Sequence, residues 1–150
     1  MTRRDDILQE ARKRGRDMGL PYAGALLPAE AHHLAQQQPA ARLVDVRSRA
    51  ELDFVGRIPG SIEVEWKSYP GMLPNPNFIP QLEQKVPKDS IVMFLCRSGG
   101  RSNETAVAAT QAGFTETYNV LEGFEGDRDA GGHRNTVGGW RAAGLPWVQS

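Results

Sequence analysis

The sequence contains a single cysteine, Cys96, among its 150 residues. One cysteine excludes an internal disulfide, and it excludes every zinc site that is built on several cysteines. The three histidines do not form a metal-binding cluster either. His32 and His33 are adjacent, so they point in different directions on a helix, and His133 stands alone. We therefore expect neither a disulfide nor a metal ion in this protein.

Long apolar segments and an excess of charge are missing as well. Lys+Arg and Asp+Glu both number 18, so the overall charge predicts no binding to nucleic acid or to an anionic membrane surface. No apolar run approaches the ~20 residues of a membrane-spanning helix, and residues 1–19 lack the apolar segment of a secretory signal. These features predict a cytoplasmic protein, in which the lone thiol stays reduced.

The sequence does contain a regular alternation of strand-like and helix-like segments. Its length suits one domain. The segments typical of strands are 23–27, 41–48, 62–64, 88–96 and 117–123. The segments typical of helices are 28–38, 49–56, 78–86 and 102–113. This order predicts an α/β domain with a mainly parallel central sheet flanked by helices.

The first part of the chain differs from the rest. Residues 2–18 are highly charged with a sparse apolar stripe, which predicts an amphipathic helix that ends at Gly19 and Pro21. We therefore divide the chain into an N-terminal helical extension, 1–21, and a domain, 22–150. A solvated arm and a partner-binding helix are alternatives for the extension, and its role stays open.

Two stretches are expected to form surface loops. Residues 66–81 contain four prolines, and residues 124–139 are polar and rich in glycine. Both stretches look longer than a minimal domain needs, so they are expected to shape the mouth of a site. We expect the chain to close with a short helix and a tail over 140–150, and the first loop to be ordered by three aromatic residues, Trp66, Tyr69 and Phe78.

The sequence around Cys96 has the features of a nucleophilic site. The apolar run 91–95 predicts a buried strand, and ligands of α/β sheets bind at the carboxyl ends of strands. The glycines of "RSGGR" allow a tight turn with inward N–H groups, and a helix starting near Ser102 adds its positive end. Cations and a helix N-terminus favour the nucleophilic thiolate. A buried inert cysteine is the alternative, but two arginines beside it would have no partner.

Three segments together resemble the rhodanese family of sulfurtransferases. They are "LVDVRSRAELDFVGRIPGSI" (43–62), "VMFLCRSGGRS" (92–102) and "AGFTETYNVLEGF" (112–124). The resemblance covers roughly residues 22–148 and depends on the order of all three segments. One departure is Arg57, which stands where the family turn Gly-His-Ile-Pro-Gly usually has histidine.

The resemblance implies a rhodanese-like α/β domain that moves a sulfane sulfur from thiosulfate or a related donor to a thiol or cyanide. Cys96 would be the nucleophile and would carry the sulfur as a persulfide, without a metal or an organic cofactor. Arg97 and Arg101 would bind the small anionic donor. The residues implied to bind substrate around the outer sulfur are Arg97, Ser98, Gly99, Gly100, Arg101 and Ser102.

Two other functions stay open beside this one. Related phosphatases and arsenate reductases have a Cys-x5-Arg loop, whereas here Arg101 comes one residue sooner and Ser102 takes the sixth position. The tighter loop suits a single sulfur atom better than a tetrahedral oxyanion, which favours the sulfurtransferase. The second alternative is a non-enzymatic carrier or sensor that hands a persulfide to an acceptor protein. The physiological donor and acceptor and the oligomeric state stay open.

The remaining polar residues have structural interpretations. Asp45 and Arg47 follow a buried strand, and we expect a salt bridge that braces the neighbouring loops; a place for Asp45 near the pocket is the alternative. Glu51 is also expected to be structural. The three tryptophans come without a basic stripe, so binding of nucleic acid has little support.

Overall fold

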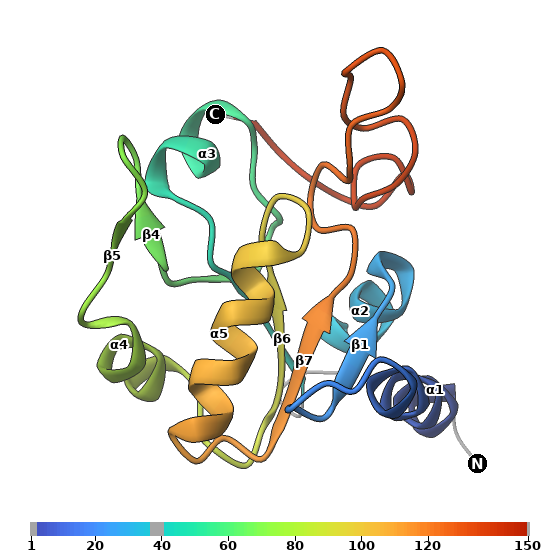
Figure 1. Ribbon diagram of the computed structural model, residues 1–150, viewed down its shortest axis with the longest axis vertical. Coiled ribbons are helices and arrows are strands. Elements are labelled where there is room, and N and C mark those ends of the chain that lie inside the picture. The colour runs from blue at the N-terminus through green and yellow to red at the C-terminus, as the bar shows by residue number, and fades with distance from the viewer. Residues whose placement is uncertain (1–2, 37–40, 150) are drawn as a thin grey trace.

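The computed structural model describes residues 3–36 and 41–149 (Figure 1). Within these residues, five strands form one sheet in the order β1-β7-β6-β2-β3, and every neighbouring pair is parallel. The strands are β1 (Gly24–Leu26), β7 (Glu116–Val120), β6 (Ile91–Leu95), β2 (Ala41–Asp45) and β3 (Ile62–Glu63). The expected α/β fold with a mainly parallel sheet is confirmed.

The central strand β6 is buried along its whole length, as its uninterrupted apolar sequence predicts. It pairs with β2 on one side and with β7 on the other, and Phe94 is the register partner of both Val44 and Asn119. Because the three strands are parallel, their carboxyl ends meet at one edge of the sheet. Cys96 follows β6 directly at this edge.

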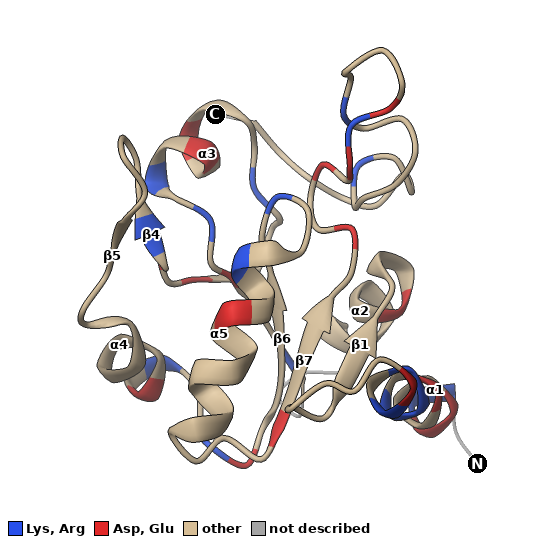
Figure 2. Cartoon of the chain, in the orientation of Figure 1, with Lys and Arg blue, Asp and Glu red and all other residues tan. Residues whose placement is uncertain are grey.

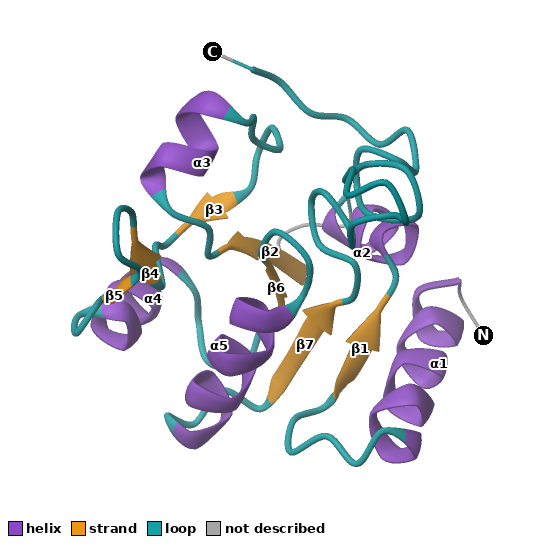
Figure 3. Ribbon diagram, turned by 45° about the horizontal axis from the view of Figure 1, so that its top comes forward, coloured by secondary structure: helices purple, strands orange, loops and turns teal. Residues whose placement is uncertain are grey.

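Helices cover both faces of the sheet (Figures 1 and 3). One apolar cluster includes Leu8 of α1 (Arg3–Asp17) and Leu34 of α2 (Pro28–Ala35). The other includes Leu82 of α4 (Phe78–Lys85) and Ala106 of α5 (Gly100–Gln111). The short α3 (Arg49–Phe54) lies between β2 and β3 in the chain. No helix in the described part of the chain is long and apolar enough to cross a membrane.

The N-terminal helix α1 is packed on the sheet edge and is not a solvated arm. Ile7, Leu8 and Ala11 are buried on it, although Figure 2 shows that the helix is densely charged. The contact is close: a Cβ on Gly24 of β1 would lie 2.3 Å from the carbonyl oxygen of Ala11, so only glycine fits there. The division of the chain at residue 21 stays a prediction.

The proline-rich segment is more regular than expected. It contains the antiparallel strands β4 (Lys67–Ser68) and β5 (Leu73–Pro74). The rings of Trp66 and Phe78 meet edge to face at 5.0 Å and order the segment as predicted. The expectation for Tyr69 is wrong, because this residue at the hairpin tip is 69% exposed and packs on neither ring.

Two helix predictions need correction. The helix after Cys96 begins at Gly100, two residues before the expected start, because Gly99 adopts a left-handed φ of 112° and caps it. The expected C-terminal helix is absent from residues 140–149, which form turns and a bridge between Val148 and Arg57. Glycine and proline interrupt that segment at 144 and 146. The predicted end of the 28–38 helix, at residues 37 and 38, lies outside the described residues.

Candidate active site

The sulfur of Cys96 lies inside the loop that follows β6. Its Sγ accepts hydrogen bonds from the backbone N–H of Gly99 at 3.1 Å and of Ser102 at 3.3 Å. We call these two N–H groups the cradle. Cys96 is only 1% exposed, and α5 directs its positive N-terminal end at this loop. The arrangement is suited to holding negative charge on the sulfur.

The turn after β7 fixes the backbone at the start of the loop. The carbonyl oxygen of Cys96 accepts from the N–H of Phe124 at 2.8 Å, and that of Arg97 accepts from the N–H of Glu125 at 2.9 Å. The turn approaches so closely that a Cβ on Gly123 would lie 2.5 Å from the oxygen of Cys96. Gly123 also has a φ of 64°, which favours glycine.

Arg101 is not available as a free cation. Its guanidinium donates to both carboxylate oxygens of Glu51, at 2.6 and 2.9 Å. Glu51 is placed there by the capping box of α3, in which its carboxylate accepts from the N–H and the hydroxyl of Ser48. The argument that two arginines beside an inert thiol would have no partner therefore fails for Arg101, whose partner is Glu51. The structural role expected for Glu51 includes this ion pair.

The pair is stabilised in its charged form. Burial opposes the charge of Glu51, but the hydrogen bonds and the attraction of Arg101 outweigh it and lower the pKa of Glu51 from 4.5 to about 2. Burial likewise opposes the charge of Arg101, and the same contacts raise the pKa of Arg101. Each group thus holds the other charged, and the pair fixes α3 against the Cys96 loop.

Arg97 differs from Arg101 because its side chain is exposed and has no ion-pair partner among the residues 3–36 and 41–149. Both arginines line a cleft of about 640 Å³ at the mouth of the loop. The proline-rich segment contributes to this cleft, since Tyr69, Gly71 and Met72 line it. From the glycine-rich loop only Glu125 lines it.

The other predicted site residues hold different places. Ser102 is fully buried, and its Oγ lies 3.3 Å from Cys96 Sγ. Among the described contacts of the sulfur there is none with Ser98 or Gly100. The structure thus brings Gly99 and Ser102 to the sulfur, and it places Arg97 and Arg101 around the opening.

Asn119 supports the site but was missed by the sequence analysis. Its side chain reaches from β7, accepts a hydrogen bond from the hydroxyl of Ser102 at 2.5 Å and donates to the carbonyl oxygen of Gly99 at 3.2 Å. One side chain thus contacts both residues that form the cradle. A signal existed in the sequence, because asparagine interrupts an otherwise apolar strand end beside the cysteine strand.

Asp45 and Arg47 form the expected structural salt bridge. Both side chains are fully buried, with 2.7 Å between Arg47 Nη2 and Asp45 Oδ2. The same Nη2 donates to the carbonyl oxygen of Gly56, and the guanidinium lies 4.1 Å from the ring centre of Phe124. The pair connects β2 to the turns around it and makes none of the described contacts with the sulfur of Cys96.

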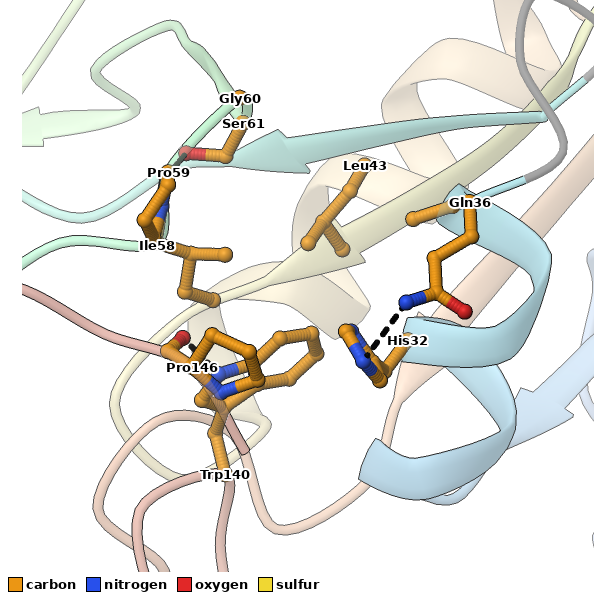
Figure 4. Close-up of a pocket in the computed structure, with 10 residues that line it drawn as sticks. His32, Gln36, Leu43, Ile58, Pro59, Gly60, Ser61, Trp140 and Pro146 are labelled. Atoms are coloured by element: carbon orange, nitrogen blue, oxygen red, sulfur yellow. Dashed lines mark hydrogen bonds between the residues drawn. The ribbon is translucent and has the colours of Figure 1, made fainter. Parts of the chain in front are cut away.

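A second hollow, of about 300 Å³, shares no lining residue with the cleft (Figure 4). It lies between α2, β2 and the C-terminal segment. The ring of His32 meets Trp140 edge to face at 5.5 Å, and the amide of Gln36 points at His32. Its walls are mostly apolar side chains such as Leu43 and Ile58, and none of the predicted site residues lines it.

Comparison with known proteins identifies the family. The family model described as rhodanese-like domain matches residues 27–130. The chain belongs to the rhodanese-like domain family. In the solved structures, Rv0390 from M. tuberculosis is 46% identical, with a TM-score of 0.78 over 86% of this chain and 99% of that chain.

Relatives of this rhodanese-like protein are found among curated sequences too. The uncharacterized protein RC0915 of Rickettsia conorii is 36% identical over 113 residues, which are 71% of this chain and 82% of that protein. Thiosulfate sulfurtransferase 16, a chloroplastic protein of Arabidopsis thaliana, is 31% identical over 85 residues, or 55% of this chain and 70% of the plant protein. The family assignment agrees with the resemblance found in the sequence.

Proposed function

We propose that this rhodanese-like protein is a sulfurtransferase that carries a sulfane sulfur on Cys96. The observation that carries the proposal is that the buried sulfur of Cys96 accepts hydrogen bonds from the two N–H groups of the cradle, at 3.1 and 3.3 Å, inside a short loop. Backbone N–H groups fixed in this way hold negative charge without reorganising during a reaction. The plant relative that is named a thiosulfate sulfurtransferase supports the same chemistry.

The proposed reaction has two steps. The thiolate of Cys96 attacks the outer sulfur of thiosulfate, a new S–S bond forms, and sulfite leaves with the electron pair of the broken bond. An acceptor thiolate or cyanide then attacks the outer sulfur of the Cys96 persulfide, and the Cys96 thiolate leaves. The cradle holds the anionic sulfur before and after each step, and no metal or organic cofactor enters the scheme.

The two arginines have separate roles in this proposal. Arg97 binds the anionic donor, because its exposed guanidinium stands at the cleft without an ion-pair partner in the described part of the chain. Arg101 is neutralised by Glu51 and positions the loop. Ser98 and Gly100 complete the loop around the outer sulfur, and Ser102 contributes its N–H. We place the reaction in the cytoplasm, where a lone thiol stays reduced.

The rim of the cleft favours a protein as the sulfur acceptor beside small thiols. Phe54 is 79% exposed, Tyr69 is 69% exposed and Met72 is 41% exposed, and all three line the cleft. Exposed apolar side chains gathered at one opening are typical of a surface that contacts another protein. This observation supports the carrier alternative, in which the persulfide passes to an acceptor protein.

The test is sulfur transfer measured with thiosulfate and cyanide, with thiocyanate as the product. Wild-type protein is expected to form thiocyanate, and Cys96→Ala is expected to form none. Hydrolysis of an aryl phosphate without sulfur transfer would instead assign the phosphatase alternative. Loading with thiosulfate followed by release only to a protein thiol, and not to cyanide, would assign the carrier.

A further inference from the structure

Tyr22 contacts the helix that follows the active-site loop from a distant part of the chain. It precedes the matched residues 27–130, in the connection between α1 and β1. Its side chain is 7% exposed and belongs to the apolar cluster under α4 and α5, whereas α1 packs into the cluster on the opposite face. The N-terminal segment therefore passes around the β1 edge of the sheet and contacts both layers (Figure 3).

The hydroxyl of Tyr22 binds the first turn of α5. It donates to Oδ1 of Asn103 at 2.5 Å, and the N–H of Asn103 donates to the carbonyl oxygen of Gly99 at 3.2 Å. Burial raises the pKa of the Tyr22 hydroxyl, and a hydrogen bond with Asn119 opposes that rise. The carbonyl oxygen of Gly99 thus accepts from the backbone N–H of Asn103 and from the side-chain amide of Asn119.

The same turn carries the cradle. Gly99 and Ser102 supply the two N–H groups on Cys96 Sγ, and Asn103 is the next residue of the helix. Hydrogen bonds weaken steeply when their angle or distance changes, so a small rotation of this turn reduces the stabilisation of the sulfur anion.

We infer that Tyr22 is a positioning residue for Cys96: its hydroxyl, acting through Asn103, fixes the first turn of α5 and with it the cradle. This inference rests on the proposed function, and it gives Tyr22, the first residue after the N-terminal extension, a role in the reaction. Arg97, which binds the donor in that proposal, is exposed and lines the cleft, whereas Tyr22 and Asn103 do not line it. Loss of the Tyr22 hydroxyl is therefore expected to act on the chemical step and to leave donor binding intact.

The test compares Tyr22→Phe with wild type in the thiosulfate–cyanide reaction. We expect kcat to fall about threefold to tenfold, the effect of one neutral hydrogen bond, while KM for thiosulfate stays unchanged. Asn103→Ala removes the same hydrogen bond from its exposed end and keeps the test valid should the first variant fold poorly. The double variant is expected to be no slower than Tyr22→Phe alone, because Asn103→Ala removes a hydrogen bond that Tyr22→Phe has already removed.

The matched control is Tyr118→Phe. Tyr118 is buried like Tyr22, at 0% exposure, but its side chain packs in the cluster on the opposite face of the sheet. We expect its kcat and KM to equal those of wild type. An equal loss of kcat in this control, a rise of KM in Tyr22→Phe, or unchanged kcat in both Tyr22→Phe and Asn103→Ala would each overturn the inference.

A second readout does not depend on sulfur transfer. Hydrogen exchange at the N–H groups of Gly99 and Ser102, followed by NMR, is expected to accelerate about threefold to tenfold in Tyr22→Phe, while exchange within β6 stays unchanged. If wild-type protein transfers no sulfur, the proposed function fails and this measurement still tests the positioning role. If sulfur is transferred and the exchange at both groups does not change, the positioning role alone is wrong.

Discussion

The guanidinium of Arg101 makes two hydrogen bonds with the carboxylate of Glu51, at 2.6 and 2.9 Å, across fifty residues of sequence. This pair joins α3 to the loop that holds Cys96. It also changes the electrostatics of the site, because it leaves Arg97 as the exposed cation at the cleft. Two arginines that look equivalent in the sequence therefore have different roles in the fold.

The Glu51–Arg101 pair makes the stability of the protein depend on acid pH. The pKa of Glu51 is about 2 in the folded protein against 4.5 ordinarily, so its contribution is complete above about pH 4.5 and is lost as the pH falls towards 2. We expect about 2 kcal/mol of unfolding free energy to be lost in this window, since partial exposure screens the pair. Urea unfolding at a series of pH values measures the loss.

The control for this prediction is Glu83→Gln. Glu83 pairs with Lys88 on the surface, where the two side chains are 40% and 49% exposed, so its removal is expected to leave the acid dependence unchanged. Glu51→Gln is expected to be less stable at neutral pH and to show a flatter pH dependence. An identical slope in wild type and Glu51→Gln would contradict the account.

Arg97→Ala is expected to weaken donor binding. Removing the exposed cation should raise KM for thiosulfate by about tenfold or more, the effect of a charge-assisted hydrogen bond, with a smaller change in kcat. Arg128→Ala is the matched control, because Arg128 is exposed in the glycine-rich loop and does not line the cleft. Steady-state kinetics decide the point, and an unchanged KM in Arg97→Ala would remove Arg97 from the donor site.

Gly123→Ala is expected to disrupt the loop through a backbone clash. The new Cβ would lie 2.5 Å from the oxygen of Cys96, at a φ of 64°. Gly132→Ala is the matched control, because Gly132 has a similar φ of 81° but nothing within 4 Å of the new Cβ. We expect the control to lose about 1 kcal/mol of stability from the backbone conformation alone. Gly123→Ala should lose clearly more and should lose sulfur transfer; equal losses in thermal unfolding would argue against the close contact.

The apolar rim predicts a selective effect on protein acceptors. Replacing Phe54 and Tyr69 by serine should slow transfer from the Cys96 persulfide to a cysteine peptide with apolar flanks by about tenfold, while transfer to cyanide stays the same. Val137→Ser is the control, since Val137 is 64% exposed and does not line the cleft. Single-turnover transfer from loaded protein gives both rates. Equal slowing with peptide and cyanide would show that the rim acts on the loop and not on the acceptor.

The sequence predicted the features that depend on local order along the chain. The apolar run before Cys96 predicts the buried strand, and the glycines after it predict a tight turn into a helix. The early start of α5 was missed, because Gly99 acts as the helix cap without a side-chain hydrogen bond, whereas polar caps are the usual signal. Contacts between distant segments could not be predicted from the sequence. The pairing of Arg101 with Glu51, for example, depends on where the sheet places α3. The approach of Tyr22 to Asn103 likewise depends on the path of the chain around β1.

The most direct test of the central claim is the intact mass of the protein after incubation with thiosulfate and removal of the small molecules. Wild-type protein is expected to gain the mass of one sulfur atom, to lose it on addition of cyanide, and to release thiocyanate in equal amount. Cys96→Ala is expected to gain no mass. A wild-type protein that takes up no sulfur, or a Cys96→Ala variant that takes up as much as wild type, would contradict the assignment of Cys96 as the sulfur carrier.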